Sequence, residues 1–365
     1  MTRELYSIAY IFPLLTIAAF LIGGATLYVL PIITFVAIPL LEAVFSGSTD
    51  NISEAESASR QQDSVFYYML YGMVVLHVST IALFIYLVSQ NHFIGSDLTG
   101  AVISAGICCG VFGINIGHEL GHRSNAFDQR LAKLMLLTSL YMHFFIEHNR
   151  GHHARVSTEE DPASSRKNEL VYTFWFRSIT MSWISAWHLE KKRLRRKSSW
   201  EKVVKNEMLH FQLIQVALLL SIFAIGGLST MIAFMLAALL GILLLETVNY
   251  IEHYGLQRNK KSNGRYERVR PCHSWNSNHS IGRMLLFELS RHSDHHAHPG
   301  RKYSALRHFD DSPQFPAGYP SMILLSLVPP LWFAIMNPHL EREMARLDNQ
   351  EVARLGNQKM ARLGN

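Results

Sequence analysis

Cysteine is scarce in this chain, and its placement excludes two kinds of site. The 365 residues include three cysteines, Cys108, Cys109 and Cys272, and no two of them have CxxC spacing. The spacing therefore excludes a thiolate zinc site or an iron–sulfur cluster of the usual kind. A disulfide framework is excluded as well, because it needs several paired cysteines.

Charged residues are also few, and the deficit is concentrated in long runs. They make up 17% of the chain, whereas a soluble globular protein has about 25%. Between Tyr6 and Phe45 the only charged residue is Glu42. Runs of this length leave a helix no solvent-facing side, which argues against a soluble helical protein. Three further stretches carry no Asp, Glu, Lys or Arg, namely Val65–Val88, Leu98–Gly117 and His210–Leu245.

These uncharged stretches predict membrane crossings. A spanning helix needs about 20 mostly apolar residues. The first stretch is long enough for two crossings that turn at Gly23-Gly24, and His210–Tyr250 for two that turn near Gly226-Gly227. The other two stretches give one crossing each, so the sequence predicts an all-α integral membrane protein with six transmembrane helices. The first run is no cleaved signal peptide, because it continues into a second crossing without a polar cleavage region.

The basic residues all fall on one side of such a bundle. The three short turns, near Gly23, at 89–97 and near Gly226, contain no Lys or Arg. The other side receives all 34 basic residues, including the run KKRLRRK at 191–197, and the positive-inside rule makes that side cytoplasmic. Both termini are expected there. The run at 191–197, called the basic run below, is typical of a face beside anionic lipid or of a docking surface for an acidic protein. No nucleic-acid-binding module is visible.

The chain changes character at about residue 340. Residues 1–340 hold the apolar runs and are expected to form one integral-membrane domain. Within them, Pro320–Met336 is interrupted by Pro329-Pro330, which favours a re-entrant or surface-lying segment over a seventh crossing. In residues 341–365 the tripeptide Ala-Arg-Leu recurs every eight residues, three times in all. Three such short copies do not make a solenoid, and we expect a polar helical tail.

Histidine, by contrast, is abundant. Nineteen are present, and nine fall in four short clusters at the ends of the uncharged stretches. One transition-metal ion takes about four to six ligands, so nine imidazoles predict two ions. That number indicates redox metal chemistry in a histidine-rich cap on the cytoplasmic side. The nine residues are His118, His122, His148, His152, His153, His253, His292, His295 and His296.

Within three clusters the spacing predicts shared helix faces. Residues three or four apart lie on one side of a helix. We therefore expect the histidines of each set to point the same way. The sets are His118 with His122, His148 with His152, and His292 with His295 and His296.

Carboxylates flank the clusters. Such groups commonly accept the second ring N–H of a ligating histidine and so fix its tautomer. We expect this supporting role for Glu119, Glu147, Glu252 and Asp294, together with the amide of Asn249.

Two other readings use part of the same pattern. The pentapeptide HELGH at 118–122 matches HExxH, a zinc-protease signature in which Glu119 would be the general base. That interpretation leaves at least six clustered histidines unexplained. A histidine-rich metal transporter would place its ligands along a path within the spans, whereas these gather on one side.

The four motifs HELGHR, EHNRGHH, NYIEHYG and RHSDHHAHP resemble those of the membrane alkane 1-monooxygenases, which belong with the integral-membrane diiron desaturases and hydroxylases. The segment PCHSWNSNH at 271–279 resembles the stretch between the last two motifs of that family. The resemblance extends from the first spans to about Pro338.

The resemblance implies a bacterial inner-membrane enzyme with two iron ions on the nine histidines. Its reaction would be O₂-dependent hydroxylation of n-alkanes to 1-alcohols, with electrons from rubredoxin that a rubredoxin reductase has reduced. The chain carries no rubredoxin-type CxxC pair, so the carrier would be a separate protein. A xylene-type aryl-methyl hydroxylase, or a fatty-acyl hydroxylase or desaturase, would use the same site and remains an alternative.

An alkane has no polar group, so its affinity must come from burying CH₂ groups, at about 0.8 kcal/mol each. We expect an apolar slot lined by residues one and two helical turns before His118 and His253. Ordinary helix–helix packing explains the same residues equally well. They are Gly110, Val111 and Ile114 before His118, and Asn249, Tyr250 and Glu246 before His253, with Leu243 and Ile242 beyond.

Overall fold

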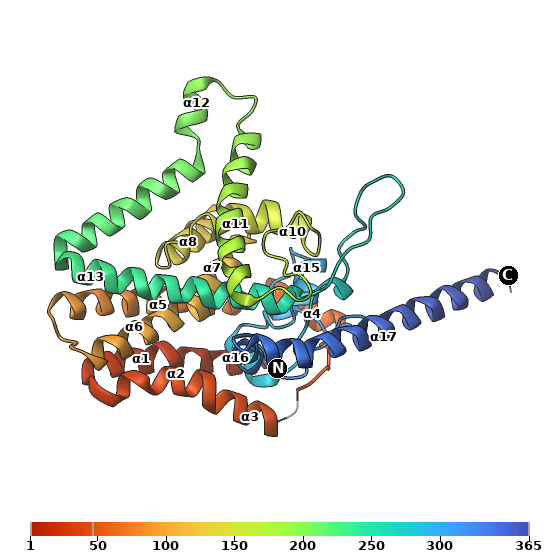
Figure 1. The fold of residues 1–365 in the computed structure, drawn as a ribbon, viewed down its shortest axis with the longest axis horizontal. Coiled ribbons are helices and arrows are strands. Elements are labelled where there is room, and N and C mark those ends of the chain that lie inside the picture. Colours follow the sequence, from red (N-terminus) through yellow and green to blue (C-terminus); the bar gives the residue numbers. More distant parts are fainter. Residues whose placement is uncertain (1, 46, 364–365) are drawn as a thin grey trace.

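The computed structural model describes residues 2–45 and 47–363, with the backbone alone for 351–363. Helices dominate it (Figure 1). No strand forms within these residues, where β pairing is limited to isolated bridges of Lys260 with Tyr266 and Asn276 with Gln314. The prediction of an all-α chain is confirmed.

The helical elements of the first half, in chain order, are η1 (Arg3–Tyr10), α1 (Ile11–Ile22), η2 (Gly24–Tyr28), α2 (Val29–Ile32), η3 (Ile33–Ala37), α3 (Ile38–Val44), α4 (Glu54–Gln62), α5 (Val65–Ser89), α6 (Ser96–Cys108), η4 (Cys109–Ile114), α7 (Asn115–Gly121), α8 (Ala126–Leu137), α9 (Phe144–Glu147), η5 (His148–His152) and α10 (His153–Arg155). Those of the second half are α11 (Val171–Arg193), α12 (Ser199–Val204), α13 (Glu207–His253), η6 (Pro271–His273), α14 (Ser280–Leu285), α15 (His292–Ala297), η7 (Tyr303–Ala305), α16 (Tyr319–Ser326) and α17 (Pro329–Leu363).

Five helical stretches of the described chain are long and apolar enough to cross a membrane. The last of them, α13, has 47 residues and breaks at Gly227, whose φ of 71° suits glycine because it has no Cβ. The two arms of α13 diverge from this break (Figure 1). The expected turn near Gly226-Gly227 is confirmed, while the six expected crossings correspond to five helices. These are Arg3–Ile22, Gly24–Val44, Val65–Ser89, Ser96–Gly121 and Glu207–His253.

The three turns between the apolar helices lie together at the left of Figure 1, and the labelled chain ends lie away from them. The Gly24 N–H donates to the Asp97 carboxylate at 2.9 Å, which joins the first turn to the second. A Cβ on Gly226 would lie 2.7 Å from the Cβ of Ser89, so the third turn packs against the end of α5. All loops that carry the histidine clusters are therefore separated from these turns by the length of the bundle.

The segment Pro320–Met336 does not form a seventh span. It folds into α16 and the start of α17, and α16 packs against α13 and α3. Trp332 and Met336 are fully buried. Helix α17 then continues past residue 340 and ends at Leu363.

A buried ion pair ties the first span to the loop that precedes α15. The Tyr6 hydroxyl donates to Glu288 Oε1 at 2.7 Å. The Arg283 guanidinium pairs with the same carboxylate at 2.7 Å, and both side chains are almost fully buried, at 6% and 4% exposed. Arg283 also donates to the Ser48 carbonyl at 2.9 Å. These contacts fix the backbone just before His292.

Replacing Arg283 with methionine would leave the buried Glu288 carboxylate with the Tyr6 hydroxyl and with Arg291, whose Nε lies 3.7 Å away. We expect a loss of about 1.5–3 kcal/mol of stability, measured as a lower thermal midpoint of the detergent-solubilised protein. Arg195→Met, at an exposed position, is the control and should change stability by less than about 0.5 kcal/mol. Equal midpoints for the two variants would contradict the structural role of the pair.

Candidate metal centre

The nine clustered histidines converge on two adjacent sites. The nine residues divide into two groups. Within each group the candidate ligand atoms lie within 4.8 Å of one another. No other histidine, cysteine or carboxylate of the described residues joins either group. The five-histidine group is His118, His122, His148, His153 and His295, and the four-histidine group is His152, His253, His292 and His296.

The Nε2 atoms of the five-histidine group form a closed ring. Successive Nε2–Nε2 distances are 3.0, 3.1, 2.9, 3.1 and 3.3 Å in the order His118, His295, His153, His148, His122 and back to His118. Two nitrogens at right angles around a metal at about 2.1 Å would lie about 3 Å apart. The ring therefore has the spacing that a single bound metal ion requires.

The four-histidine group has fewer close contacts between ring nitrogens than the five-histidine group. His296 Nε2 lies 2.8 Å from His292 Nε2 and 3.2 Å from His152 Nε2. Both ring nitrogens of His253 are buried without a hydrogen-bond partner among the described residues. A buried unsatisfied nitrogen costs about 1–3 kcal/mol, and a metal ion between these rings would remove that cost. The donors present thus fit a metal ion in this group too.

Burial keeps the imidazoles outside the spans neutral. It lowers the pKa of His122, His148 and His153 well below the usual value, and the neighbouring rings lower it further. The same causes act on His292, His295 and His296. Neutral imidazole is the form that binds a metal, so these rings are prepared to act as ligands near neutral pH.

The second cluster has a different register from the one expected. Residues 148–152 form a π-helix, η5, in which residues five apart share a face. His148 accordingly meets His153, with their Nε2 atoms 2.9 Å apart in the five-histidine group. His152 turns to the four-histidine group. The expectation that His148 and His152 point the same way is wrong, because it assumed α-helical periodicity.

The last cluster also divides between the groups. α15 is a six-residue helix that lies between them. His292 and His296 contribute to the four-histidine group, while His295 contributes to the five-histidine group. Of the three expected sets, only His118 with His122, at the end of the fourth span, stays whole within one group.

Asp161 supports the site, and sequence reasoning missed it. Its Oδ2 lies 2.8 Å from Nδ1 of His152 and accepts from the Ser164 hydroxyl at 2.6 Å. Burial alone would raise the pKa of Asp161, but these two partners lower it. Two exposed glutamates, Glu159 and Glu160, precede it. In a loop without periodicity nothing in the sequence distinguishes the three carboxylates.

Three of the four carboxylates expected to support the histidines form ion pairs with arginines instead. None of them contacts the ring of a clustered histidine in the described structure. The reason is local, because each has an arginine four to eight residues further along that reaches it. The pairs are Glu119 with Arg123 at 2.5 Å, Glu147 with Arg155 at 2.5 Å and Asp294 with Arg301 at 2.6 Å.

Glu252 does reach a clustered histidine, but on the side of the candidate ligand atoms. Its Oε2 lies 3.1 Å from Nε2 of His292, and its Oε1 accepts from the Tyr319 hydroxyl at 2.6 Å. Asn249 contacts no clustered histidine and donates instead to Glu246 at 3.4 Å. The outer support therefore consists of different residues from those expected.

A narrow apolar cavity of about 110 Å³ reaches both groups. His118 and His148 of the five-histidine group and His292 of the four-histidine group form part of its wall. The second span contributes Thr34, Phe35 and Ile38. The expected residues Gly110, Val111 and Ile114 line it too, along the fourth span.

Of the residues expected on α13, Asn249 lines this cavity and the others do not. Glu246 instead accepts from the Tyr141 hydroxyl at 2.8 Å, Tyr250 packs on Phe174, and Leu243 is absent from the wall. The prediction took residues one and two helical turns before His253. The cavity lies instead on the helix face that carries Glu252, the residue before His253. The residues that α13 does contribute are Leu244, Leu245, Val248, Asn249 and Glu252.

Comparison with known proteins agrees with this geometry. A family model described as fatty acid desaturase matches residues 98–326. Two proteins named alkane 1-monooxygenase are similar over most of the chain. The one from Acinetobacter baylyi is 40% identical over 322 residues, which cover 87% of this chain and 76% of that protein. The one from Ectopseudomonas oleovorans is 39% identical over 302 residues, covering 83% and 75%.

A more distant relative is the xylene/toluene monooxygenase hydroxylase component of Pseudomonas putida, 26% identical over 240 residues that cover 66% of this chain and 63% of that protein. Fold, histidine groups and family model together define an integral-membrane metalloenzyme of the desaturase class. Within that class the chain belongs to the alkane 1-monooxygenase family, as its histidine motifs indicated.

Replacing Asp161 with asparagine would remove the charge that holds His152. We expect metal affinity to fall about 10- to 100-fold at the four-histidine group only, so that the protein keeps one ion after dialysis against a weak chelator. Metal content by mass spectrometry is the measurement. Glu160→Gln, one residue away and exposed, is the control. Equal metal content in the two variants would remove Asp161 from the site.

Proposed function

We propose that this protein hydroxylates the terminal methyl group of n-alkanes, with O₂, at two iron ions held by the nine histidines. One observation carries the proposal: histidines of both groups form part of the wall of one apolar cavity. The relatives named alkane 1-monooxygenase support the substrate class.

The five-histidine group would hold one iron ion and the four-histidine group the other. Imidazole suits zinc and copper as well as iron, so the choice of iron rests on the family. When bound, the iron pair would supply the chemistry by which O₂ is reduced and a C–H bond of the substrate is broken. The overall reaction converts an alkane, O₂, two electrons and two protons into a 1-alcohol and water.

The cavity would bind and orient the alkane. Its apolar walls stabilise each buried CH₂ group by about 0.8 kcal/mol. Gly110 allows the fourth span and α13 to approach closely, because a Cβ there would lie 3.1 Å from the Gly241 carbonyl oxygen. The walls that this approach brings together enclose an apolar slot, and His118 and His292 form part of its lining. A chain entering such a slot end-on would present its terminal methyl group to the metal ions.

The membrane arrangement that goes with this function has six crossings, with the break at Gly227 as the turn between the last two. The basic residues support placing the metal centre and both termini on the cytoplasmic side of a bacterial inner membrane. Rubredoxin, reduced by rubredoxin reductase, would approach from that side as the electron donor.

The alternatives differ in how well they account for the site. A xylene-type or fatty-acyl hydroxylase would use the same histidines and differ in the cavity alone. A zinc protease would need Glu119 to act as a base beside one ion. That carboxylate instead binds Arg123 and the Tyr303 N–H, and His118 and His122 belong to a group of five histidines.

The decisive experiment combines metal and product analysis. Protein purified without oxygen should contain two iron ions per chain and convert octane to 1-octanol when supplied with rubredoxin, reductase and O₂. Xylene and a fatty-acyl substrate test the related alternatives in parallel. A single zinc ion with no alcohol formed would overturn the proposal.

Enlarging Val111 to phenylalanine should shorten the slot. We expect the longest accepted alkane to lose at least one carbon, because the added ring occupies space that CH₂ groups would fill. The measurement is product yield across a series of n-alkanes. Leu239→Phe, on the exposed face of α13 at 45% exposed, should leave the chain-length profile unchanged. Identical profiles for the two variants would show that the cavity does not hold the substrate.

A further inference from the structure

The chain presents two separate clusters of basic side chains. One is the basic run at the end of α11. The other is the loop of residues 256–270 between α13 and η6, called the basic hairpin here. We propose that the acidic electron-carrier protein docks on the basic hairpin and not on the basic run. This inference rests on the proposed function, because that function requires two electrons per alcohol from an external protein.

The basic hairpin offers exposed charge without compensation. Lys260, Lys261, Arg265 and Arg268 are all exposed. Within the described residues none of these four forms an ion pair with a carboxylate. A row of unpaired cations raises the association rate of an acidic partner and fixes its orientation.

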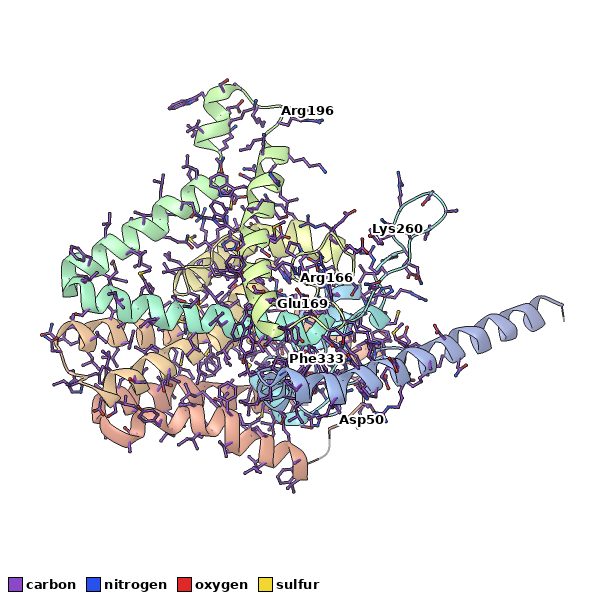
Figure 2. All side chains as sticks on the ribbon, viewed as in Figure 1. Asp50, Arg166, Glu169, Arg196, Lys260 and Phe333 are labelled. Atoms are coloured by element: carbon purple, nitrogen blue, oxygen red, sulfur yellow. The ribbon has the colours of Figure 1, made fainter. Side chains whose placement is uncertain are left out.

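The hairpin is also held in shape. The Lys261 N–H donates to the Arg265 carbonyl at 2.8 Å, and the Lys260 ammonium lies 5.0 Å from the centre of the Tyr266 ring. Gly264 makes the turn with a φ of 76°. Figure 2 shows Lys260 on this loop, which projects from the body of the protein. The charges are thus presented on a defined surface.

Short paths lead from the base of the hairpin to the five-histidine group. The Arg258 guanidinium donates to the carbonyls of Ala154 at 3.0 Å and Val156 at 3.3 Å. The Arg258 N–H donates to the Ser157 carbonyl at 2.7 Å. Ala154 directly follows His153, so two residues connect the hairpin to a candidate ligand.

The four-histidine group is equally close along the chain. The hairpin begins just after His253, and the Leu256 N–H donates to the His253 carbonyl at 3.2 Å. At the other end of the hairpin, the His273 carbonyl accepts from the Ser157 hydroxyl at 2.6 Å. Covalent and hydrogen bonds therefore lead from one surface to both candidate metal sites, as an electron donor would need.

The basic run differs in its surroundings and not in its exposed charge. Arg193 is paired with Glu190 at 2.5 Å, while the other five basic side chains of the run are exposed and, within the described residues, form no ion pair with a carboxylate. Over the same part of the chain, no hydrogen bond of these five side chains leads to a candidate metal ligand. Arg196 lies far out beside α12, away from the loop of Lys260 (Figure 2). Trp200 on α12 is 76% exposed. Exposed tryptophan next to basic side chains is typical of contact with lipid headgroups.

The surroundings of the hairpin limit the docking face further. On one side its base adjoins a recess that is also lined by Asp310, Asp311 and Asp348. These carboxylates would repel an acidic protein. The carrier would therefore approach from the side of the hairpin that faces the Ala154–Ser157 backbone.

The test compares two charge-neutralised variants of the full protein. One is K260Q/K261Q/R265Q/R268Q in the hairpin, and the matched control is K192Q/R195Q/R196Q/K197Q in the basic run. The binding of oxidised rubredoxin is measured at low ionic strength, with metal-free and with iron-loaded protein. Thermal midpoint and metal content verify that each variant is folded, and the smaller variant K260Q/K261Q serves if the quadruple one is not.

We expect rubredoxin to bind the hairpin variant at least about tenfold more weakly, with a flatter salt dependence, and the control within about twofold of the original protein. In turnover, the KM for rubredoxin should rise while kcat is retained. Unchanged binding by the hairpin variant, or weakening by the control alone, would overturn the docking site. If octane hydroxylation by the unaltered protein fails while the binding difference remains, the proposed function falls and the docking site stands.

Discussion

The structure depends on the convergence of nine imidazoles, seven of them buried, and in eight of them the Nε2 atom lies within 3.3 Å of another Nε2. Neutral rings packed at about 3 Å gain little from each other, since their lone pairs repel unless a proton or a cation lies between them. The chain therefore has to hold them from outside. It does so with elements from four distant segments, the fourth span, η5, the end of α13 and α15. A metal ion in each group would turn this unfavourable packing into ligation.

Around the rings, opposite charges are placed in pairs. Arg123, Arg155 and Arg301 neutralise the carboxylates that lie next to the histidines in sequence, which keeps those carboxylates away from the ligand atoms. Asp161 alone binds the outer nitrogen of a ring, that of His152. Glu252 stands apart, because it faces the inner side of His292 and the cavity at once. The polar layer thus lies between the protein surface and the apolar slot, and Glu252 with three of the clustered histidines forms part of the slot's wall.

Periodicity and composition predicted the spans, the turn at Gly227 and the set of nine histidines, because charge-free runs and clustered imidazoles are local features of the sequence. They could not divide the nine into groups. That division depends on a π-turn at His148 and on the position of the short helix α15 between two sites, and neither leaves a local signal. The prediction of the α13 face that lines the cavity was largely wrong for a similar reason. It counted back from His253, whereas the lining follows from Glu252, and a shift of one residue rotates the predicted face by about 100°. Asp161 lies in an aperiodic loop and could only be found in space.

The six residues of α15 supply ligands to both groups. An ion captured by His292 and His296 would immobilise the same single helical turn that presents His295 to the neighbouring site. The entropy of ordering that turn would then be lost when the first ion binds and not again when the second binds. Filling either site would therefore raise the metal affinity of the other. The coupling is limited to this one turn, so a molecule that loses the ion of one group would bind the other ion more weakly but could still keep it.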